Sequence, residues 1–311
     1  MNYRNIADLN DIILKRISIL PKDFDLIVGI PRSGMLPANL IALYLSKPFT
    51  DIHSFVNGHI YKSGERGQYI DVKRFKRILI VDDSIASGSA MEKAKELIKT
   101  VSADFEINLC AIYVVPGKVK MVDYYFEEVA LPRYFQWNIL HHSTLEKACF
   151  DIDGVLCIDP TEDQNDDGPI YTDFVLNAKP LFIPSCKIGT LVTSRLEKYR
   201  KETETWLDKN NVKYSKLVML DLPNKEARQK LNNHAKHKAN TYKDISYNLF
   251  FESSLNQAIE INRITGKPVF CTENFRMIFD AQSFSYNMKS GKYFPWLRKV
   301  TLKLRDKLRN R

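Results

Sequence analysis

The sequence predicts an α/β protein built from two domains in series, on three observations. Short apolar strands alternate with helical segments, this alternation breaks near residues 130–147 and then restarts, and the length of 311 residues suits two domains of ordinary size. The composition, with 44% hydrophobic and 27% charged residues, excludes a disordered or fibrous chain. We place one domain at residues 1–130, a linker at 131–147, a second domain at 148–288 and a basic tail at 289–311.

The spacing of apolar residues predicts the order of elements in each half. In the first half we expect helices over residues 4–18, 36–45 and 90–100, strands over 25–30, 78–81 and 107–115, and a long loop or ribbon over 51–70. In the second half we expect strands over 148–152, 188–192, 217–220 and 248–251, and a helix over 199–210. Strands that alternate with helices in this way favour parallel sheets.

The cysteines and the apolar runs bear on the compartment. Five cysteines are widely spaced and form no C-x-x-C pair, so a disulfide framework or a structural zinc site is not expected. Lys15 and Arg16 interrupt the apolar run near the start, and no run approaches the roughly 18–20 apolar residues of a membrane span. We therefore expect a cytoplasmic protein.

The basic character of the chain is concentrated in its tail. Residues 289–311 hold nine Lys and Arg residues and one acid, whereas the net charge of the whole chain is +9. Leu297, Val300, Leu304 and Leu308 share one helical face, next to Trp296. This pattern predicts an amphipathic helix on an anionic membrane surface, at the inner face of the membrane. A helix packed on the protein body and a nucleic-acid contact are the alternatives.

In the first half, residues 78–91 (ILIVDDSIASGSAM) combine features of a site for a phosphorylated sugar. A buried strand delivers Asp82 and Asp83 to its carboxyl end, where carboxylates can accept hydrogen bonds from sugar hydroxyls. A loop of small residues then leads into a helix, whose N-terminal N–H groups and partial positive charge suit a phosphate. Alternatively, the two acids only cap the helix.

This segment resembles the PRPP-binding motif of the type I phosphoribosyltransferases, with a serine-containing loop in place of the more usual Thr-Gly-Gly-Thr. The resemblance implies that the acids hold the ribose hydroxyls and that the loop holds the 5-phosphate of PRPP. Residues 29–34 (GIPRSG) match the pyrophosphate loop, and residues 55–70 match the flexible closing loop. The implied PRPP-binding residues are Arg32, Ser33, Gly34, Asp82, Asp83, Ser84, Ala86, Ser87, Gly88 and Ser89, with Tyr61, Lys62 and Arg66 in the closing loop.

In the second half, Asp151 and Asp153 follow a strand, two residues apart. Both carboxylates are thus expected at the rim of a sheet, where one can attack phosphorus while the other protonates the leaving oxygen. The acidic run at residues 159–168 is expected to form a flap over this site. A simple turn or a fragment of a calcium loop is the alternative interpretation of Asp-x-Asp-Gly.

The order of motifs resembles the haloacid dehalogenase superfamily, which implies a Rossmann-like phosphatase domain. By this resemblance Asp151, Asp153, Thr193 and Lys238 are catalytic, and Asp151, Asp153 and Glu252 bind Mg²⁺. Lys225, Lys236 and Lys243 are alternative candidates for the catalytic lysine. The intervals between motifs leave no room for a large cap domain, so the site is expected to be open to a bulky substrate.

Together the two resemblances imply a bifunctional enzyme. The first domain would transfer 5-phosphoribosyl from PRPP to an acceptor with the help of Mg²⁺, and the second would remove the 5-phosphate. Such an enzyme is similar to the dual-domain ribofuranosyltransferases of capsule polysaccharide synthesis, so we expect a glycan acceptor. An orotate-like nucleobase phosphoribosyltransferase with an attached phosphatase, a PRPP-sensing module and an effector acting on nucleic acid are the alternatives. The oligomeric state is not predicted.

Overall fold

The computed structural model describes residues 1–61, 75–99, 105–227 and 234–283. The chain divides into two compact units, Met1–Ile139 and Leu140–Arg311. The basic tail expected at residues 289–311 lies outside the described residues. Within the described ranges, no helix is both long enough and apolar enough to cross a membrane.

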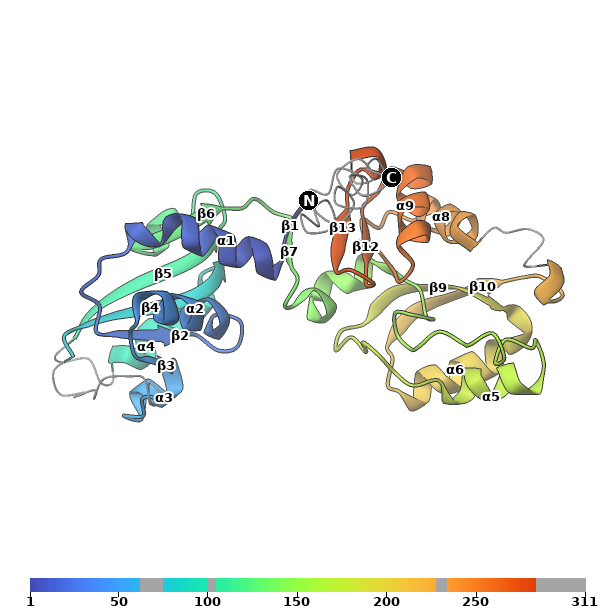
Figure 1. Cartoon of the computed structure of the whole chain (residues 1–311), viewed down its shortest axis with the longest axis horizontal. Helices are drawn as coiled ribbons and strands as arrows, with labels where there is room; N and C mark the ends of the chain where they lie inside the picture. The colour runs from blue at the N-terminus through green and yellow to red at the C-terminus, as the bar shows by residue number, and fades with distance from the viewer. Residues whose placement is uncertain (62–74, 100–104, 228–233, 284–311) are drawn as a thin grey trace, which may run out of the picture. The chain divides into compact units, whose positions relative to one another are not determined.

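The first unit contains a parallel sheet with helices on both faces (Figure 1). The strands lie in the order β3 (Phe49–Asp51), β2 (Leu26–Gly29), β4 (Arg77–Ile85), β5 (Glu106–Val114) and β6 (Tyr124–Glu128), and each neighbouring pair is parallel. The accompanying helices are α1 (Ile6–Arg16), α2 (Met35–Leu45), α3 (Ile52–Val56) and α4 (Ser89–Lys99). The expected α/β class with a parallel sheet is confirmed.

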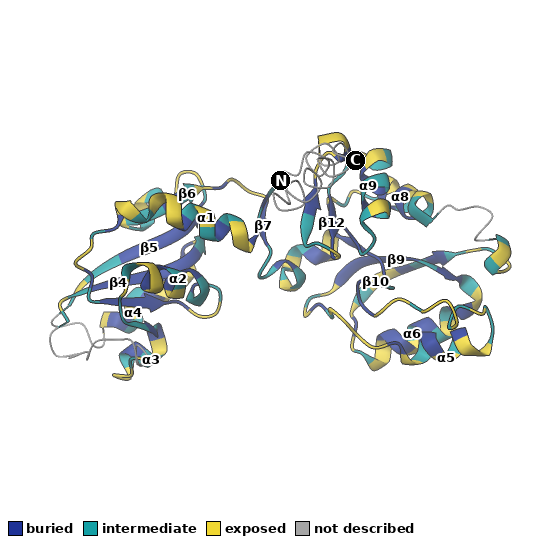
Figure 2. Ribbon diagram, viewed as in Figure 1, coloured by how far each residue is buried: buried dark blue, intermediate teal, exposed yellow. Residues whose placement is uncertain are grey.

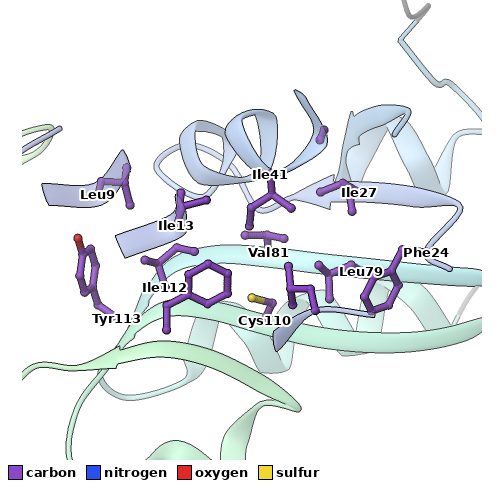
Figure 3. Packing of buried hydrophobic residues seen from close by; sticks show 14 of the residues in the cluster. Leu9, Ile13, Phe24, Ile27, Ile41, Leu79, Val81, Cys110, Ile112 and Tyr113 are labelled. Atoms are coloured by element: carbon purple, nitrogen blue, oxygen red, sulfur yellow. The ribbon is translucent and has the colours of Figure 1, made fainter. Parts of the chain in front are cut away.

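Alternation along β4 distributes its side chains between two hydrophobic cores. Leu79 and Val81 pack in one core with Leu9 and Ile13 of α1 and Ile41 of α2 (Figure 3). Ile78 and Ile80 belong to the other core, which α3 and α4 cover. Successive strand residues point to opposite faces, so a continuous apolar run fits a strand that is covered on both sides. The sheet is accordingly buried, whereas the outer faces of the helices are exposed (Figure 2).

Residues 131–147, where we expected a linker, contain regular structure. β7 (Arg133–Phe135) pairs in parallel with β1 (Asn2–Arg4). The backbone N–H of Asn2 donates to Pro132 O at 2.8 Å, and that of Gln136 donates to Arg4 O at 3.0 Å. This segment thus extends the first unit as far as Ile139.

The expected loop over residues 51–70 begins with a helix. The side chain of Asp51 accepts hydrogen bonds from the backbone N–H groups of His53 and Ser54, which caps the N-terminus of α3. Beyond Tyr61 the expected loop lies outside the described residues as far as residue 74.

The second unit has its own sheet, in the order β10 (Tyr214–Leu220), β9 (Ile188–Leu196), β8 (Cys149–Phe150), β11 (Phe250–Glu252), β12 (Val269–Cys271) and β13 (Arg276–Ile278). Only the pairing of β12 with β13 is antiparallel among these described strands. Helices α5 (Pro169–Asn177) and α6 (Arg200–Lys209) lie on one side of the sheet, and α8 (His234–Asp244) and α9 (Leu255–Thr265) lie on the other (Figure 1). Short 3₁₀ helices occur at Ile17–Ile19, Val119–Met121, Ile139–His141, Ser143–Lys147 and Glu197–Tyr199.

Candidate functional site

The acid pair of the first unit lies inside β4 and not after it. β4 continues to Ile85 because β5 pairs with it as far as Val114. Asp82 and Asp83 therefore sit near the carboxyl end of a central strand, and both are buried. Ligands of open α/β sheets bind at this edge.

Two donors from distant parts of the sequence hold the carboxylate of Asp83. The hydroxyl of Ser33 donates to Asp83 Oδ1 at 2.9 Å, and the indole Nε1 of Trp137 donates to Oδ2 at 2.7 Å. Each carboxylate oxygen can accept a second hydrogen bond, so the side chain retains acceptor capacity for a sugar hydroxyl. No motif pointed to Trp137 as a partner of Asp83, because the two residues are 54 positions apart.

The pKa of Asp82 is shifted from the usual value of an aspartate. Burial, reinforced by the neighbouring charge of Asp83, raises the pKa of Asp82 to about 8. The buried guanidinium of Arg133 opposes this rise in the pKa only partly. The raised pKa of Asp82 favours its protonated form, which reduces the repulsion of a phosphorylated sugar by this side chain.

A close approach of two main chains positions the loop at residues 31–34. A Cβ atom on Gly34 would lie 2.6 Å from Ile30 O, 2.8 Å from Val81 O and 3.0 Å from Asp82 Cα. Because all three are backbone atoms, only glycine lets the loop pass this close to β4. The approach brings the Ser33 hydroxyl to Asp83, whereas Arg32 is exposed.

The small-residue loop leads from β4 into the N-terminus of α4. The hydroxyls of Ser87 and Ser89 lie 2.8 Å apart, and the backbone N–H of Ser89 donates to Ser87 Oγ at 3.3 Å. Gly88 has a φ of +88°, a conformation that favours glycine. The exposed hydroxyls and the helix N-terminus suit an anion. Ser84 is half-buried, and Ala86 is exposed in the same loop.

The described part of the expected closing loop does not reach the acid pair. The hydroxyl of Tyr61 donates to Asp51 Oδ2 at 2.7 Å, and its ring packs against Phe49. Lys62 and Arg66 lie outside the described residues.

In the second unit the structure brings Asp151, Lys238 and Glu252 together. Lys238 Nζ donates to Asp151 Oδ2 at 2.6 Å, to Glu252 Oε2 at 2.7 Å and to Gln257 Oε1 at 3.1 Å. All three charged side chains are buried. Among the four candidate lysines, Lys238 is thus the one in contact with both acids, whereas Lys225 Nζ donates to the backbone oxygen of Asn165.

Burial and charge act against each other in this cluster. Burial raises the pKa of Asp151 to about 7, although the ammonium of Lys238 favours its ionised form. Burial alone would lower the pKa of Lys238, but the carboxylates of Asp151 and Glu252 raise it. The lysine is therefore charged, and it partly neutralises the carboxylates of Asp151 and Glu252.

Asp153 lies in a separate ion pair with Arg195. The guanidinium of Arg195 contacts both oxygens of Asp153, at 2.6 Å through Nη2 and 3.1 Å through Nε. Arg195 is fully buried at 0% exposure and also contacts Cys157 Sγ at 3.3 Å. Thr193 is buried, and its Oγ1 accepts from the backbone N–H of Arg195 at 3.2 Å. Arg195 follows Thr193 by two positions in β9, and residues two apart in a strand lie on the same face. This spacing could have indicated that Arg195 lies near the predicted site residue Thr193.

The acid side chains of the second unit are paired with cations in this arrangement. Lys238 and backbone N–H groups donate to the carboxylate oxygens of Asp151 and Glu252, and the guanidinium of Arg195 contacts both oxygens of Asp153. Across the described residues, no group of three or more His, Cys, Asp or Glu side chains could hold a metal ion. We therefore derive no step through a metal in this unit.

A cavity of about 490 Å³ opens beside Asp151. Its lining includes Gly154, Asp159, Phe182 and Glu273. Gly154 has a φ of +74°, and a Cβ there would lie 2.3 Å from Ser253 Oγ and 2.7 Å from Asp159 Oδ2. The expected flap residue Asp159 thus lies directly against the loop that carries Asp151 and Asp153.

Comparison with known families defines the class of the first unit. Residues 2–144 match the family model of the phosphoribosyl transferase domain. The N-terminal part of the chain therefore contains a phosphoribosyl transferase domain, and its parallel sheet is that of the type I fold. The match includes Asp82, Asp83 and Trp137.

Several individual proteins are similar to part of this chain. The transcriptional regulator GfcR of Methanococcoides burtonii is 29% identical over 99 residues, which are 30% of this chain and 48% of that protein. The match thus spans about half the length of this curated relative. The Helicobacter pylori xanthine-guanine-hypoxanthine phosphoribosyltransferase is 14% identical, covers 44% of this chain and 92% of its own, and has a TM-score of 0.33. A Pyrococcus horikoshii purine phosphoribosyltransferase is 26% identical with the same two coverages and the same TM-score of 0.33.

Proposed function

We propose that this chain transfers a 5-phosphoribosyl group from PRPP to a glycan acceptor and then removes the 5-phosphate, which leaves a ribosyl group on the acceptor. The observation that carries the proposal is the presence, on one chain, of the Asp82–Asp83 site in a phosphoribosyl transferase domain and of the Asp151–Lys238–Glu252 cluster. The second half of the sequence resembles the haloacid dehalogenase superfamily, and the contact of Lys238 with Asp151 supports the proposed phosphatase step.

In the transfer step, the bond between C1 of the ribose and the diphosphate breaks, and an acceptor hydroxyl oxygen forms a bond to C1. The proton of that hydroxyl passes to the departing diphosphate. Asp82 and Asp83 accept hydrogen bonds from the ribose hydroxyls, and the Ser87–Ser89 loop holds the 5-phosphate at the N-terminus of α4. Arg32 is exposed beside this site and supplies positive charge for the departing diphosphate. We propose Mg²⁺ as the counter-ion of that diphosphate.

In the phosphatase step, a carboxylate oxygen of Asp151 attacks phosphorus and the bond from phosphorus to the 5-oxygen of ribose breaks. For Asp153 to act as the acid, its carboxylate must leave the ion pair with Arg195 and take up a proton from solvent, which it then gives to that oxygen. Thr193 holds the phosphoryl group by a hydrogen bond. Water then cleaves the acyl phosphate and releases inorganic phosphate, which restores Asp151. Lys238 stabilises the charge that develops on the transferred group.

The test is mass spectrometry of glycan and nucleobase acceptors incubated with PRPP and Mg²⁺, with the native protein and the Asp151→Asn variant. We expect a ribosyl increment from the native protein and a phosphoribosyl increment from the variant. A phosphoribosyl increment on a free base with both proteins would instead make the chain a nucleotide-forming enzyme. Diphosphate release that is insensitive to the double change Asp82→Asn and Asp83→Asn would overturn the transferase assignment.

The proposal includes contact of the basic tail, residues 289–311, with an anionic membrane surface, where a glycan acceptor would be assembled. The carrying feature is the apolar stripe of Leu297, Val300, Leu304 and Leu308 beside the basic residues. Co-sedimentation with phosphatidylglycerol vesicles tests it. We expect the full chain to sediment and the chain lacking residues 289–311 to stay in solution, and equal sedimentation would contradict the proposal.

A further inference from the structure

The cavity beside Asp151 has one apolar wall, formed by Leu181 and Phe182. Their side chains are 43% and 39% exposed, although both are large and hydrophobic. The ring of Phe182 is supported edge-on by Phe275, with centroids 5.6 Å apart and planes at 88°. This wall is therefore a preformed apolar surface open to a ligand.

Backbone hydrogen bonds fix this wall relative to the catalytic loop. The N–H of Leu181 donates to Leu156 O at 2.8 Å, and that of Phe182 donates to Val155 O at 3.4 Å. Because Val155 and Leu156 directly follow the Asp151–Gly154 loop, these bonds tie the backbone of the apolar wall to the backbone of that loop.

The other cavity-lining side chains are polar, and their charges are negative. Asp159 and Glu273 line the cavity with Asp151, and the hydroxyls of Ser254 and Thr272 lie among them. Glu273 is held at the N-terminus of α9, where its Oε2 accepts from the backbone N–H of Leu255 at 3.0 Å. Burial and the charges of Asp153 and Glu252 raise the pKa of Asp159.

Positive charge is scarce at this cavity. The residues that line the cavity, all of them described, include three acids and neither Lys nor Arg. Lys238 lies behind Asp151 and is shared with Glu252. A ligand with a second and third phosphate would place those charges against Asp159 and Glu273, which is unfavourable in a partly desolvated site.

We propose that this cavity binds the phosphate monoester of a single pentose linked to an uncharged, hydroxyl-rich group, and that it rejects polyanions such as the end of a nucleic-acid strand. The C–H face of a sugar ring packs on Phe182, and sugar hydroxyls donate to the carboxylates of Asp159 and Glu273. This inference rests on the proposed phosphatase step and specifies its substrate class.

The experiment compares kcat/KM of the full chain for methyl ribofuranoside 5-phosphate and for a 5′-phosphorylated trinucleotide. We expect a preference of about tenfold or more for the glycoside, since each tenfold corresponds to about 1.4 kcal/mol. Phe182→Ala is expected to raise KM for the glycoside about fivefold with a smaller change in kcat, because the ring contacts the sugar in both the ground state and the transition state. Ile170→Ala, which removes an exposed hydrophobic side chain elsewhere in the unit, is the matched control.

Glu273→Gln gives the charge test. This change is expected to raise kcat/KM for the trinucleotide and so to reduce the ratio of kcat/KM for the glycoside to kcat/KM for the trinucleotide. A trinucleotide that is hydrolysed as fast as the glycoside, with a ratio that Glu273→Gln leaves unchanged, would overturn the inference. If the native protein releases no more phosphate than Asp151→Asn from either substrate or from p-nitrophenyl phosphate, the phosphatase step itself fails, and the substrate assignment falls with it.

Discussion

The indole Nε1 of Trp137 donates a hydrogen bond of 2.7 Å to Asp83 Oδ2, although the two residues are 54 positions apart. The ring of Trp137 is itself stacked on Phe135, with centroids 4.9 Å apart, and Phe135 is stacked on Tyr113 at 5.2 Å. The position of the Asp83 carboxylate thus depends on an aromatic stack that β5 and β7 supply.

Replacing the indole by a phenyl ring separates the stacking from the hydrogen bond. We expect Trp137→Phe to keep the fold but to weaken PRPP binding about tenfold, since Asp83 loses one of its two donors. Isothermal titration with PRPP measures the loss, and circular dichroism confirms the fold. Unchanged affinity would show that Ser33 alone positions Asp83.

The raised pKa of Asp82 predicts a pH dependence of stability. Between about pH 4 and pH 8 the native side chain keeps its proton while the unfolded one releases it, so the unfolding free energy falls as the pH rises through that window. Asp82→Asn removes this fall, and at pH 8 we expect the first unit of the variant to be more stable by about 1–3 kcal/mol.

Native-state hydrogen exchange of β4 amides at several pH values measures this difference. Asp83→Asn is the matched control, because its replacement puts an amide donor opposite Ser33 or Trp137 and is expected to be destabilising. Parallel stability curves for the native protein and Asp82→Asn would refute the shifted pKa.

The backbone contacts around Gly34 predict a steric effect. In Gly34→Ala the new methyl group meets Ile30 O and Val81 O, which cannot rotate away, so we expect a loss of about 2–4 kcal/mol of stability or a displaced loop that no longer binds PRPP. Gly117→Ala controls for backbone strain, because Gly117 has a φ of +83° and open space around it. That variant is expected to lose about 1 kcal/mol. Equal losses in urea unfolding would argue against the steric explanation.

The buried pair of Arg195 and Asp153 predicts strong coupling. Arg195→Met leaves the Asp153 charge without its partner, so we expect a loss of about 3–5 kcal/mol, much of which the added change Asp153→Asn restores. Arg200→Met is the control, since Arg200 pairs with Glu197 and Glu204 at the surface and should cost about 1 kcal/mol or less. Urea unfolding of the single and double variants gives the coupling energy, and additive effects would contradict the ion pair.

Local sequence patterns were sufficient to predict individual strands and helices, but not how the strands pair. The apolar run at residues 78–81 and the helical spacing at 36–45 correspond to β4 and α2. The run alone could not show that β4 continues through Asp82 and Asp83, because that extension depends on pairing with β5. The region at 131–147 interrupts the helix–strand pattern, so the pairing of β7 with β1 could not be predicted from local sequence either.

The same distinction applies to the candidate sites. Asp151, Lys238 and Glu252 were predicted from motif order, and the structure brings them into contact. Trp137, one of the two donors to Asp83, belongs to no motif, and its position depends on the pairing of β7 with β1. Arg195 stood two positions after Thr193, but a sequence does not reveal that its charge is buried against Asp153.

The pairing of β1 with β7 links the first few residues of the chain to the surroundings of Asp83. Arg4 O accepts from the backbone of Gln136, and the backbone N–H of Ile6 donates to the Gln136 side chain at 2.9 Å, one residue before Trp137. A fragment that starts after residue 6 would release this anchor and with it the indole that holds Asp83. Tags are accordingly better fused away from the N-terminus, because trimming there would change the surroundings of the Asp83 carboxylate.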